Sequence, residues 1–222
     1  GNSTVGDGGA FWCLEGNSVF TSCTFSDNSA DNGGAISCHN SNLSFVDCSF
    51  TNNAAYDDGG AIQSTGNGFL LTTCAFANNT ALSGGAIYNY INSNSVLVDC
   101  TFLGNSSTES GWRGGGAIHN YDSDATLTNC IFQNSTAAGY GGGLWNFRSD
   151  PILTKCHFLN NTSKTGGGIY NNESSPVLNE CVFENNSSLG FSFESGGGGM
   201  CSVDDSFPLL FGCLFINNQA DY

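Results

Sequence analysis

The chain has 222 residues with 19 acidic and only 4 basic side chains, which gives a net charge of −15. Such an excess of negative charge argues against nucleic acid and against an anionic membrane surface as partners. No apolar run reaches the roughly 18 residues that a membrane-spanning helix needs, so we expect no direct membrane insertion by this segment.

Two short phrases recur along the chain and divide it into eight units. The first is a pair of glycines before an apolar residue, and this residue is Phe11, Ile36, Ile62, Ile87, Ile118, Leu144, Ile169 or Met200. The second is Cys-x-Phe, and its cysteine is Cys23, Cys48, Cys74, Cys100, Cys130, Cys156, Cys181 or Cys213. Copies are 25 or 26 residues apart except at two longer steps, and a fixed period is a primary sign of a repeat fold.

The period and the composition of the unit select the fold class. Helical repeats need more than 30 residues and would not tolerate this density of Gly, Asn and Ser, whereas three short strands joined by turns fit one coil of a solenoid. We therefore predict an all-β protein, a right-handed parallel β-helix of about eight coils of 25–26 residues with two coil insertions. Residues 1–222 are expected to form a single domain, either a segment of a longer array or a subunit that stacks end to end.

In chain order, each unit predicts a strand after the glycines, then a large apolar residue, a Cys-x-Phe strand and an asparagine at a turn. The cysteine and phenylalanine are two residues apart and point to one face, so their eight copies predict interior ladders. The large apolar residue stands three positions before the cysteine, as Phe45 stands before Cys48, which requires a bend or bulge between them. The asparagine predicts a third ladder of side-chain amides, with Ser135 as its one departure.

The paired phrases resemble a known tandem repeat. Gly34-Ala35-Ile36 together with Phe50-Thr51-Asn52-Asn53 is similar to the repeat of chlamydial polymorphic outer-membrane proteins, and the similarity covers nearly the whole chain. The resemblance implies a surface-exposed, β-helical passenger used in adhesion. The later copies depart from it, with Gly143, Gly168 and Gly199 in place of alanine.

The 11 cysteines raise the question of disulfides or metal binding. No Cys-x-x-Cys occurs and the three histidines are scattered, so we expect no metal site and no cofactor. Most thiols are expected to be buried and free, because neighbours in a ladder are marginally too far apart for a disulfide. Cys13 and Cys38 form a second column and are the best-placed disulfide pair.

Aromatic residues supply the candidates for ligand or partner binding. One column, directly after the apolar residue, is expected to face outward; it either docks sugar rings or a protein, or stacks to shield the sheet. It contains Trp12, Tyr88, His119, Trp145 and Tyr170. Two insertions, 108–113 and 190–195, enter the same corner and present further candidates for a recognition patch. These candidates are Trp112, Arg113, Phe191 and Phe193.

N-x-S/T sequons are a further surface feature. In a eukaryotic secretory pathway we expect glycans on several of them, with the ladder positions Asn105, Asn161 and Asn186 spared. The acceptors expected to be accessible are Asn2, Asn42, Asn78, Asn134, Asn160, Asn172 and Asn185.

Taken together, these patterns favour a non-catalytic, structural or adhesive repeat protein that presents loops on a rigid rod. We expect it outside the cell or at the cell surface, bound to a protein or glycan there or self-associated end to end. One alternative is a subunit of an extracellular filament or sheath. A second is a carbohydrate-active enzyme, but its acid pairs, Asp57-Asp58 and Asp204-Asp205, recur on no neighbouring unit and are interpreted as solvated turn charges.

Overall fold

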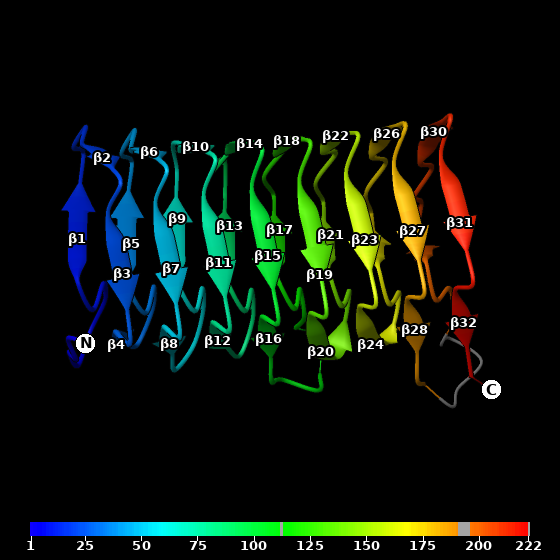
Figure 1. Cartoon of the computed structure of the whole chain (residues 1–222), viewed down its shortest axis with the longest axis horizontal. Helices are drawn as coiled ribbons and strands as arrows, with labels where there is room; N and C mark the ends of the chain where they lie inside the picture. The colour runs from blue at the N-terminus through cyan, green and yellow to red at the C-terminus, as the bar shows by residue number, and fades with distance from the viewer. Residues whose placement is uncertain (112, 191–195, 222) are drawn as a thin grey trace.

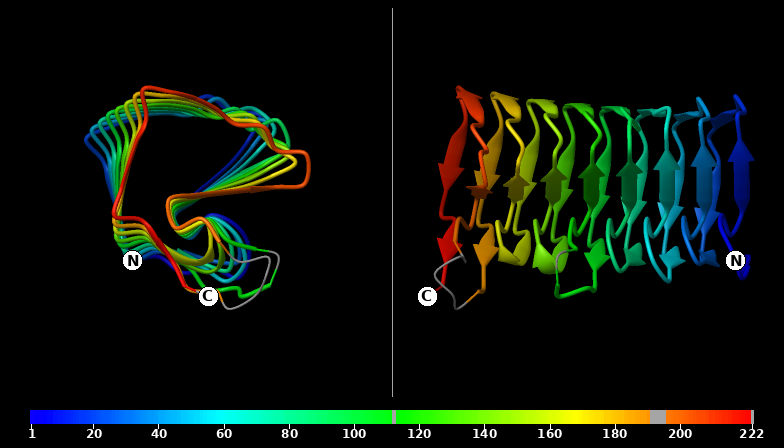
Figure 2. Two further views of the ribbon diagram at one scale, coloured as in Figure 1. Left: turned by 90° about the vertical axis from the view of Figure 1, so that its right-hand side faces the viewer. Right: turned by 180° about the vertical axis from the view of Figure 1, so that it is seen from behind.

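The structure, a computed structural model, describes residues 1–111, 113–190 and 196–221, and no helix occurs in these ranges. Short strands stack into four parallel sheets of eight strands each, and the chain visits each sheet once per coil (Figure 1). The prediction of an all-β, right-handed parallel β-helix is confirmed. The coils share one outline when viewed along the axis of the rod (Figure 2).

The strands are short and recur in a fixed order. The first sheet contains β1 (Phe11–Leu14), β5 (Ile36–His39), β9 (Ile62–Thr65), β13 (Ile87–Tyr90), β17 (Ile118–Tyr121), β21 (Leu144–Phe147), β25 (Ile169–Asn172) and β29 (Met200–Val203). The second contains β2 (Val19–Thr21), β6 (Ser44–Val46), β10 (Leu70–Thr72), β14 (Val96–Val98), β18 (Thr126–Thr128), β22 (Ile152–Thr154), β26 (Val177–Asn179) and β30 (Leu209–Phe211). The third contains β3 (Thr24–Ser26), β7 (Ser49–Thr51), β11 (Ala75–Ala77), β15 (Thr101–Leu103), β19 (Ile131–Gln133), β23 (His157–Leu159), β27 (Val182–Glu184) and β31 (Leu214–Ile216). The fourth contains β4 (Ser29–Ala30), β8 (Ala54–Ala55), β12 (Thr80–Ala81), β16 (Ser106–Ser107), β20 (Thr136–Tyr140), β24 (Thr162–Thr165), β28 (Ser187–Ser188) and β32 (Gln219–Ala220).

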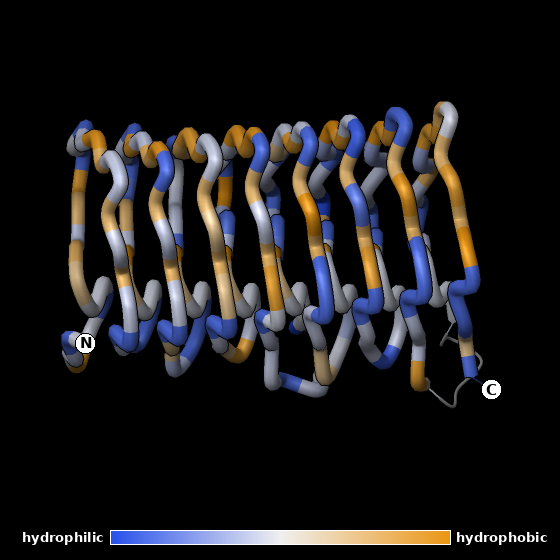
Figure 3. The backbone as a smooth tube through the Cα atoms, in the orientation of Figure 1, coloured by the Kyte–Doolittle hydropathy of each residue, from blue (hydrophilic) through white to orange (hydrophobic). Residues whose placement is uncertain are grey.

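The core is built from columns of like residues. Hydrophobic positions recur at the same place in successive coils (Figure 3). The phenylalanines of the third sheet, from Phe25 to Phe215, stack with ring centroids 4.6–4.9 Å apart and planes within 8° of parallel. Because this spacing is set by the strand separation, each ring contributes packing only when its neighbour is in register.

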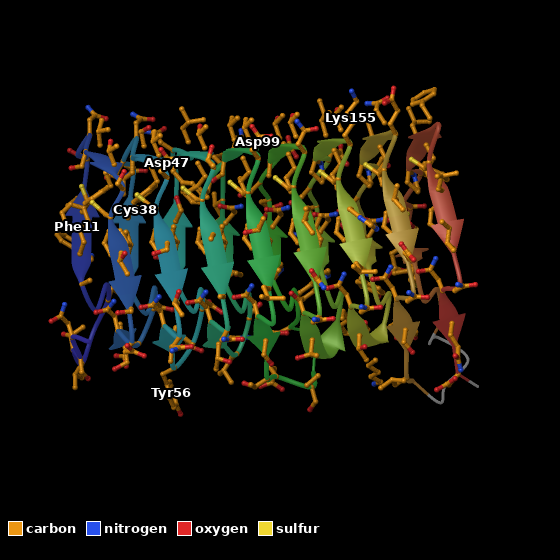
Figure 4. The ribbon with its side chains drawn as sticks, viewed as in Figure 1. Phe11, Cys38, Asp47, Tyr56, Asp99 and Lys155 are labelled. Atoms are coloured by element: carbon orange, nitrogen blue, oxygen red, sulfur yellow. The ribbon has the colours of Figure 1, made fainter. Side chains whose placement is uncertain are left out.

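The bend expected before each cysteine is a single residue in the left-handed region. Asp47, Asp99 and Lys155 have φ of 52°, 55° and 54°, and they follow one edge of the rod (Figure 4). This turn lets both the large apolar residue and the cysteine point inward, although they are three positions apart. The Cys100 thiol behind the bend donates to the Val98 carbonyl oxygen at 3.3 Å.

The cysteines are free thiols, including the pair that the sequence offered as the best-placed candidate for a disulfide. Cys13 and Cys38 are direct partners in the register of β1 and β5, yet no disulfide joins them, so this candidate bond is not formed. In-register neighbours are one strand spacing apart, about 4.8 Å, whereas the Cβ atoms of a disulfide are about 3.8 Å apart. Burial raises the pKa of the Cys38 thiol to about 11.

We predict that a thiol reagent modifies few of the cysteines in the folded protein. Seven are buried and four are half-buried, namely Cys13, Cys23, Cys201 and Cys213. Burial both blocks access and disfavours the reactive thiolate. Mass spectrometry after native alkylation should find at most four labels, and after unfolding without reductant it should find all 11. Native labelling of Cys100, or a pair of cysteines that reacts only after reduction, would contradict this picture.

Two asparagine ladders supply hydrogen bonds to polar groups at the turns and inside the β-helix. In the first, the amide of Asn53 donates to Asn79 and that of Asn79 to Asn105, each at 3.0 Å. The second, which the sequence did not lead us to expect, begins with Asn89 donating to Asn120 at 2.8 Å and continues coil by coil to Ser202. These buried amides are therefore paired, as stability requires.

Ser135 interrupts the first ladder, because its buried hydroxyl has no hydrogen-bond partner. We predict that Ser135→Asn stabilises the protein by about 1 kcal/mol, since the new amide would bond to Asn161 and to the Phe102 carbonyl as its neighbours do in their own coils. Chemical denaturation measures the change. The control Ser135→Ala should be nearly neutral. A destabilised Ser135→Asn variant would show that the column cannot accept an amide in this coil.

Candidate functional site

A groove runs along the outer face of the first sheet. Its second wall is formed by the corner segments that lead from the fourth sheet back to the glycines, and these segments pair coil to coil at Asp7–Asn32, Asp58–Ser83 and Gly114–Tyr140. At the glycines the backbone turns inward (Figure 2, left). The resulting hollow has a volume of about 680 Å³ and extends from Asp7 to Trp145. We call it the groove.

Close approach of the two walls depends on the glycine pairs. Gly59 has a φ of 67°, and a Cβ atom at Gly60 would collide with the carbonyl oxygen of Gly85 in the next coil. Only glycine permits both conditions at low cost. The repeated Gly-Gly phrase thus creates the inward corner from which the groove follows.

The predicted aromatic column faces out of the β-helix, and its members Tyr88, His119 and Trp145 line the groove. Tyr88, Trp145 and Tyr170 are only 8%, 5% and 6% exposed, which favours, of the two expected roles, the stack that shields the sheet. His119 stacks on Trp145 with ring centroids 3.9 Å apart, and its ring meets that of Tyr88 edge-on. Trp12, at the start of the column, is 51% exposed. The column is thus buried at Tyr88, Trp145 and Tyr170 and open at Trp12, a difference that sequence periodicity alone could not show.

Of the residues proposed on the insertions, Arg113 reaches the groove. Its Nη1 atom lies 2.8 Å from Oδ1 of Asp57 and 3.4 Å from Oδ1 of Asp58. Trp112, Phe191 and Phe193 lie outside the described residues. The structure therefore brings together Tyr88, Arg113 and Trp145, which are three of the sequence candidates, on the walls of one hollow.

Burial changes the charge states in the groove. It raises the pKa of Asp58 to about 6, an effect that the nearby Arg113 opposes. The side chain of Asp58 is 20% exposed and that of Asp57 is 45% exposed, so Asp57 is the more solvated of this pair. Burial also lowers the pKa of His119 well below its usual value, and Arg113 lowers it further. The imidazole is therefore neutral near pH 7 and can donate or accept one hydrogen bond at each nitrogen.

Two buried nitrogen atoms beside the groove lack partners within the described part of the chain. Nδ1 of His119 hydrogen-bonds to the hydroxyl of Ser83 at 2.6 Å, but its Nε2 is unpaired, and so is Nε1 of Trp145. A buried unpaired polar atom costs about 1–3 kcal/mol, so such atoms are rare without a function. Sequence analysis included His119 in the column but gave it no role.

Two features are absent from the described residues. None of them forms a cluster of three or more His, Cys, Asp or Glu side chains suited to a metal ion. In the same ranges, no helix is long and apolar enough to cross a membrane.

Most of the expected glycan acceptors are exposed, with one correction. Asn172 is 7% exposed and its amide donates to Asp204 at 2.6 Å, so it is inaccessible. The ladder sequons Asn105, Asn161 and Asn186 are fully buried. The exposed acceptors are Asn2, Asn42, Asn78, Asn134, Asn160 and Asn185.

Comparison with known proteins gives two family matches. Residues 106–220 match the family described as right handed beta helix region. Residues 22–39, 47–65 and 73–90 match the Chlamydia polymorphic membrane protein repeat, and each of these segments contains one Cys-x-Phe and one Gly-Gly-Ala-Ile phrase. No curated protein matches the chain.

The shifted pKa of Asp58 predicts a pH dependence of stability. Its ordinary pKa is 3.8 and its folded value is about 6, so between these values the folded state retains a proton that the unfolded chain has released. The free energy of unfolding should therefore fall as the pH rises from about 4 to about 6. Asp58→Asn should remove this contribution, which thermal unfolding across the range would measure. Equal slopes for the variant and the original protein would contradict the assignment.

Proposed function

Because the chain belongs to the right-handed β-helix family and contains Chlamydia polymorphic membrane protein repeats, we propose that it is a surface recognition domain whose lateral groove binds the partner. The repeats indicate a repeat domain of a surface protein. Within that domain, the groove mediates adhesion and carries out no catalysis. The partner is a protein or a glycan at a cell surface.

The observation behind this proposal is the pair of unpaired nitrogen atoms, His119 Nε2 and Trp145 Nε1, beside a groove with aromatic walls. Aromatic faces bind sugars and apolar side chains, and the nitrogen atoms give such binding direction. The side chains extend from strands whose register is fixed over the whole rod, so little ordering accompanies binding.

The acidic residues of the groove support binding over catalysis. Asp57 and Asp58 are adjacent in the chain and both contact Arg113. A glycosidase instead needs two carboxyl groups that flank the bond to be broken, one on each side. Here the paired acids fix the Arg113 side chain at the rim, where it can contribute to recognition.

Charge narrows the class of partner. The chain has a net charge of −15, and Asp7 and Asp58 line the groove together with Arg113. Neutral or cationic partners are therefore favoured over anionic ones. End-to-end self-association stays a separate prediction, which sedimentation analysis of the purified chain tests.

We predict that Trp145→Phe weakens partner binding about fivefold, since it removes the indole N–H but keeps a ring. The measurement is affinity for hits from arrays of glycans and of purified cell-surface proteins. The matched control is Trp12→Phe, the same substitution in the same column but beyond the walls of the groove. The proposal is overturned if neither array yields a partner, or if both variants bind as the original protein does.

A further inference from the structure

A second hollow continues the groove toward the C-terminal coils and has a different lining. Its volume is about 380 Å³, and it shares Tyr121 and Trp145 with the groove. Five aromatic rings line this hollow, and together we call them the aromatic cage. They belong to Tyr121, Tyr140, Trp145, Phe147 and Tyr170. The remaining lining residues are Asn172, Glu173 and Asp204.

Three ring pairs of the cage are tilted, unlike those of the core stack, whereas Tyr140 and Tyr170 stack with centroids 4.5 Å apart and planes 28° apart. The planes of Tyr121 and Phe147 meet at 42°, those of Tyr140 and Trp145 at 43°, and those of Trp145 and Phe147 at 56°. The corresponding centroids are 5.0, 6.0 and 6.5 Å apart. Parallel rings would bury their faces against each other, as the core phenylalanines do. The tilted rings instead line one hollow.

The charged residues that line the hollow beside the cage are both acidic. Asp204 accepts a hydrogen bond from the neutral amide of Asn172, and no cation pairs with it among the described residues. Glu173 pairs with Arg148 at 3.1 Å, but both side chains are about half exposed, so water screens this pair. The guanidinium of Arg148 also lies over the Phe147 ring at 4.7 Å. Phe147 thus holds a cation on one face, although Arg148 itself does not line the hollow.

We propose that the aromatic cage binds an organic ammonium group, which deepens and rests on the recognition function assigned to the groove. The faces of aromatic rings attract cations, and ammonium groups bound among several such rings with a carboxylate nearby gain most when water is excluded. A neutral sugar would use one flat ring and several hydrogen-bonding side chains, whereas here five rings line the hollow and its charged groups are two carboxylates. The group could be a choline-type headgroup or the side-chain ammonium of a methylated lysine.

The direct test uses small probes on the whole chain. Tetramethylammonium, choline and trimethyl-lysine are titrated by calorimetry, with the Trp145 indole N–H followed by NMR. The control ligand is the neutral analogue of choline in which carbon replaces nitrogen. We expect the ammonium probes to bind about tenfold more tightly than this analogue, because shape is kept and only charge is lost. The tighter of choline and trimethyl-lysine identifies the source of the group. Equal affinity of choline and its neutral analogue overturns the proposal.

Variants locate the binding. Phe147→Leu and Asp204→Asn should each weaken ammonium binding severalfold, whereas Phe147→Tyr, which keeps the ring, should retain it. The control is Tyr56→Leu, because Tyr56 is 78% exposed and projects away from the rod (Figure 4). Circular dichroism verifies that each variant is folded. If Tyr56→Leu weakens binding as much as Phe147→Leu does, the cage is not the site.

The two proposals fail separately. If the ammonium probes do not bind but Trp145→Phe still weakens partner binding, the cage is wrong and the groove function stands. If the probes bind in the cage but no surface partner occupies the groove, the recognition function is wrong while the ammonium site stands.

Discussion

In-register stacking of like residues, one strand spacing apart, is the constraint on which the whole rod depends. The phenylalanine stack and the asparagine ladders contribute only when each coil places the same side chain at the same height. A slip of one residue would turn every interior side chain outward and break each ladder at once. Many weak contacts therefore enforce a single register, and that register fixes every position on the outer faces.

The first sheet differs from the others because both of its faces are covered. Ile87 and Asn89 of β13 point into the β-helix, and Tyr88 between them is buried on the outer face, where it lines the groove. The glycine pairs allow those segments to approach. A solenoid thus acquires a sheltered strip along its exterior, where water is partly excluded and hydrogen bonds and charges count for more than on an open surface.

Sequence predicted the interior well because its columns repeat, and predicted the groove poorly because its contacts do not. The cysteine and phenylalanine of the Cys-x-Phe phrase, such as Cys48 and Phe50, recur two residues apart in every coil and so indicate the inward face of the strand. By contrast, the contact of His119 with Ser83 spans 36 residues, and that of Arg113 with Asp57 spans 56, with an insertion in between. The second asparagine ladder was missed for a related reason, since its column begins with cysteines and serine. Periodicity identifies what is shared by all coils, and the binding walls are what differs.

This division between repeated and varied positions also explains how the fold tolerates buried polar atoms that lower its stability. The unpaired Nε2 of His119 and Nε1 of Trp145, and the carboxyl of Asp58 with its raised pKa, each lower the stability of the folded state. His119 and Trp145 are in consecutive coils and Asp58 lies two coils before His119 on the same strip, while the ladders behind them are nearly complete. Local conflicts of this kind concentrate at functional sites when the rest of the molecule supplies the stability. The regular interior is therefore the support, and the irregular strip outside the first sheet is where binding is expected.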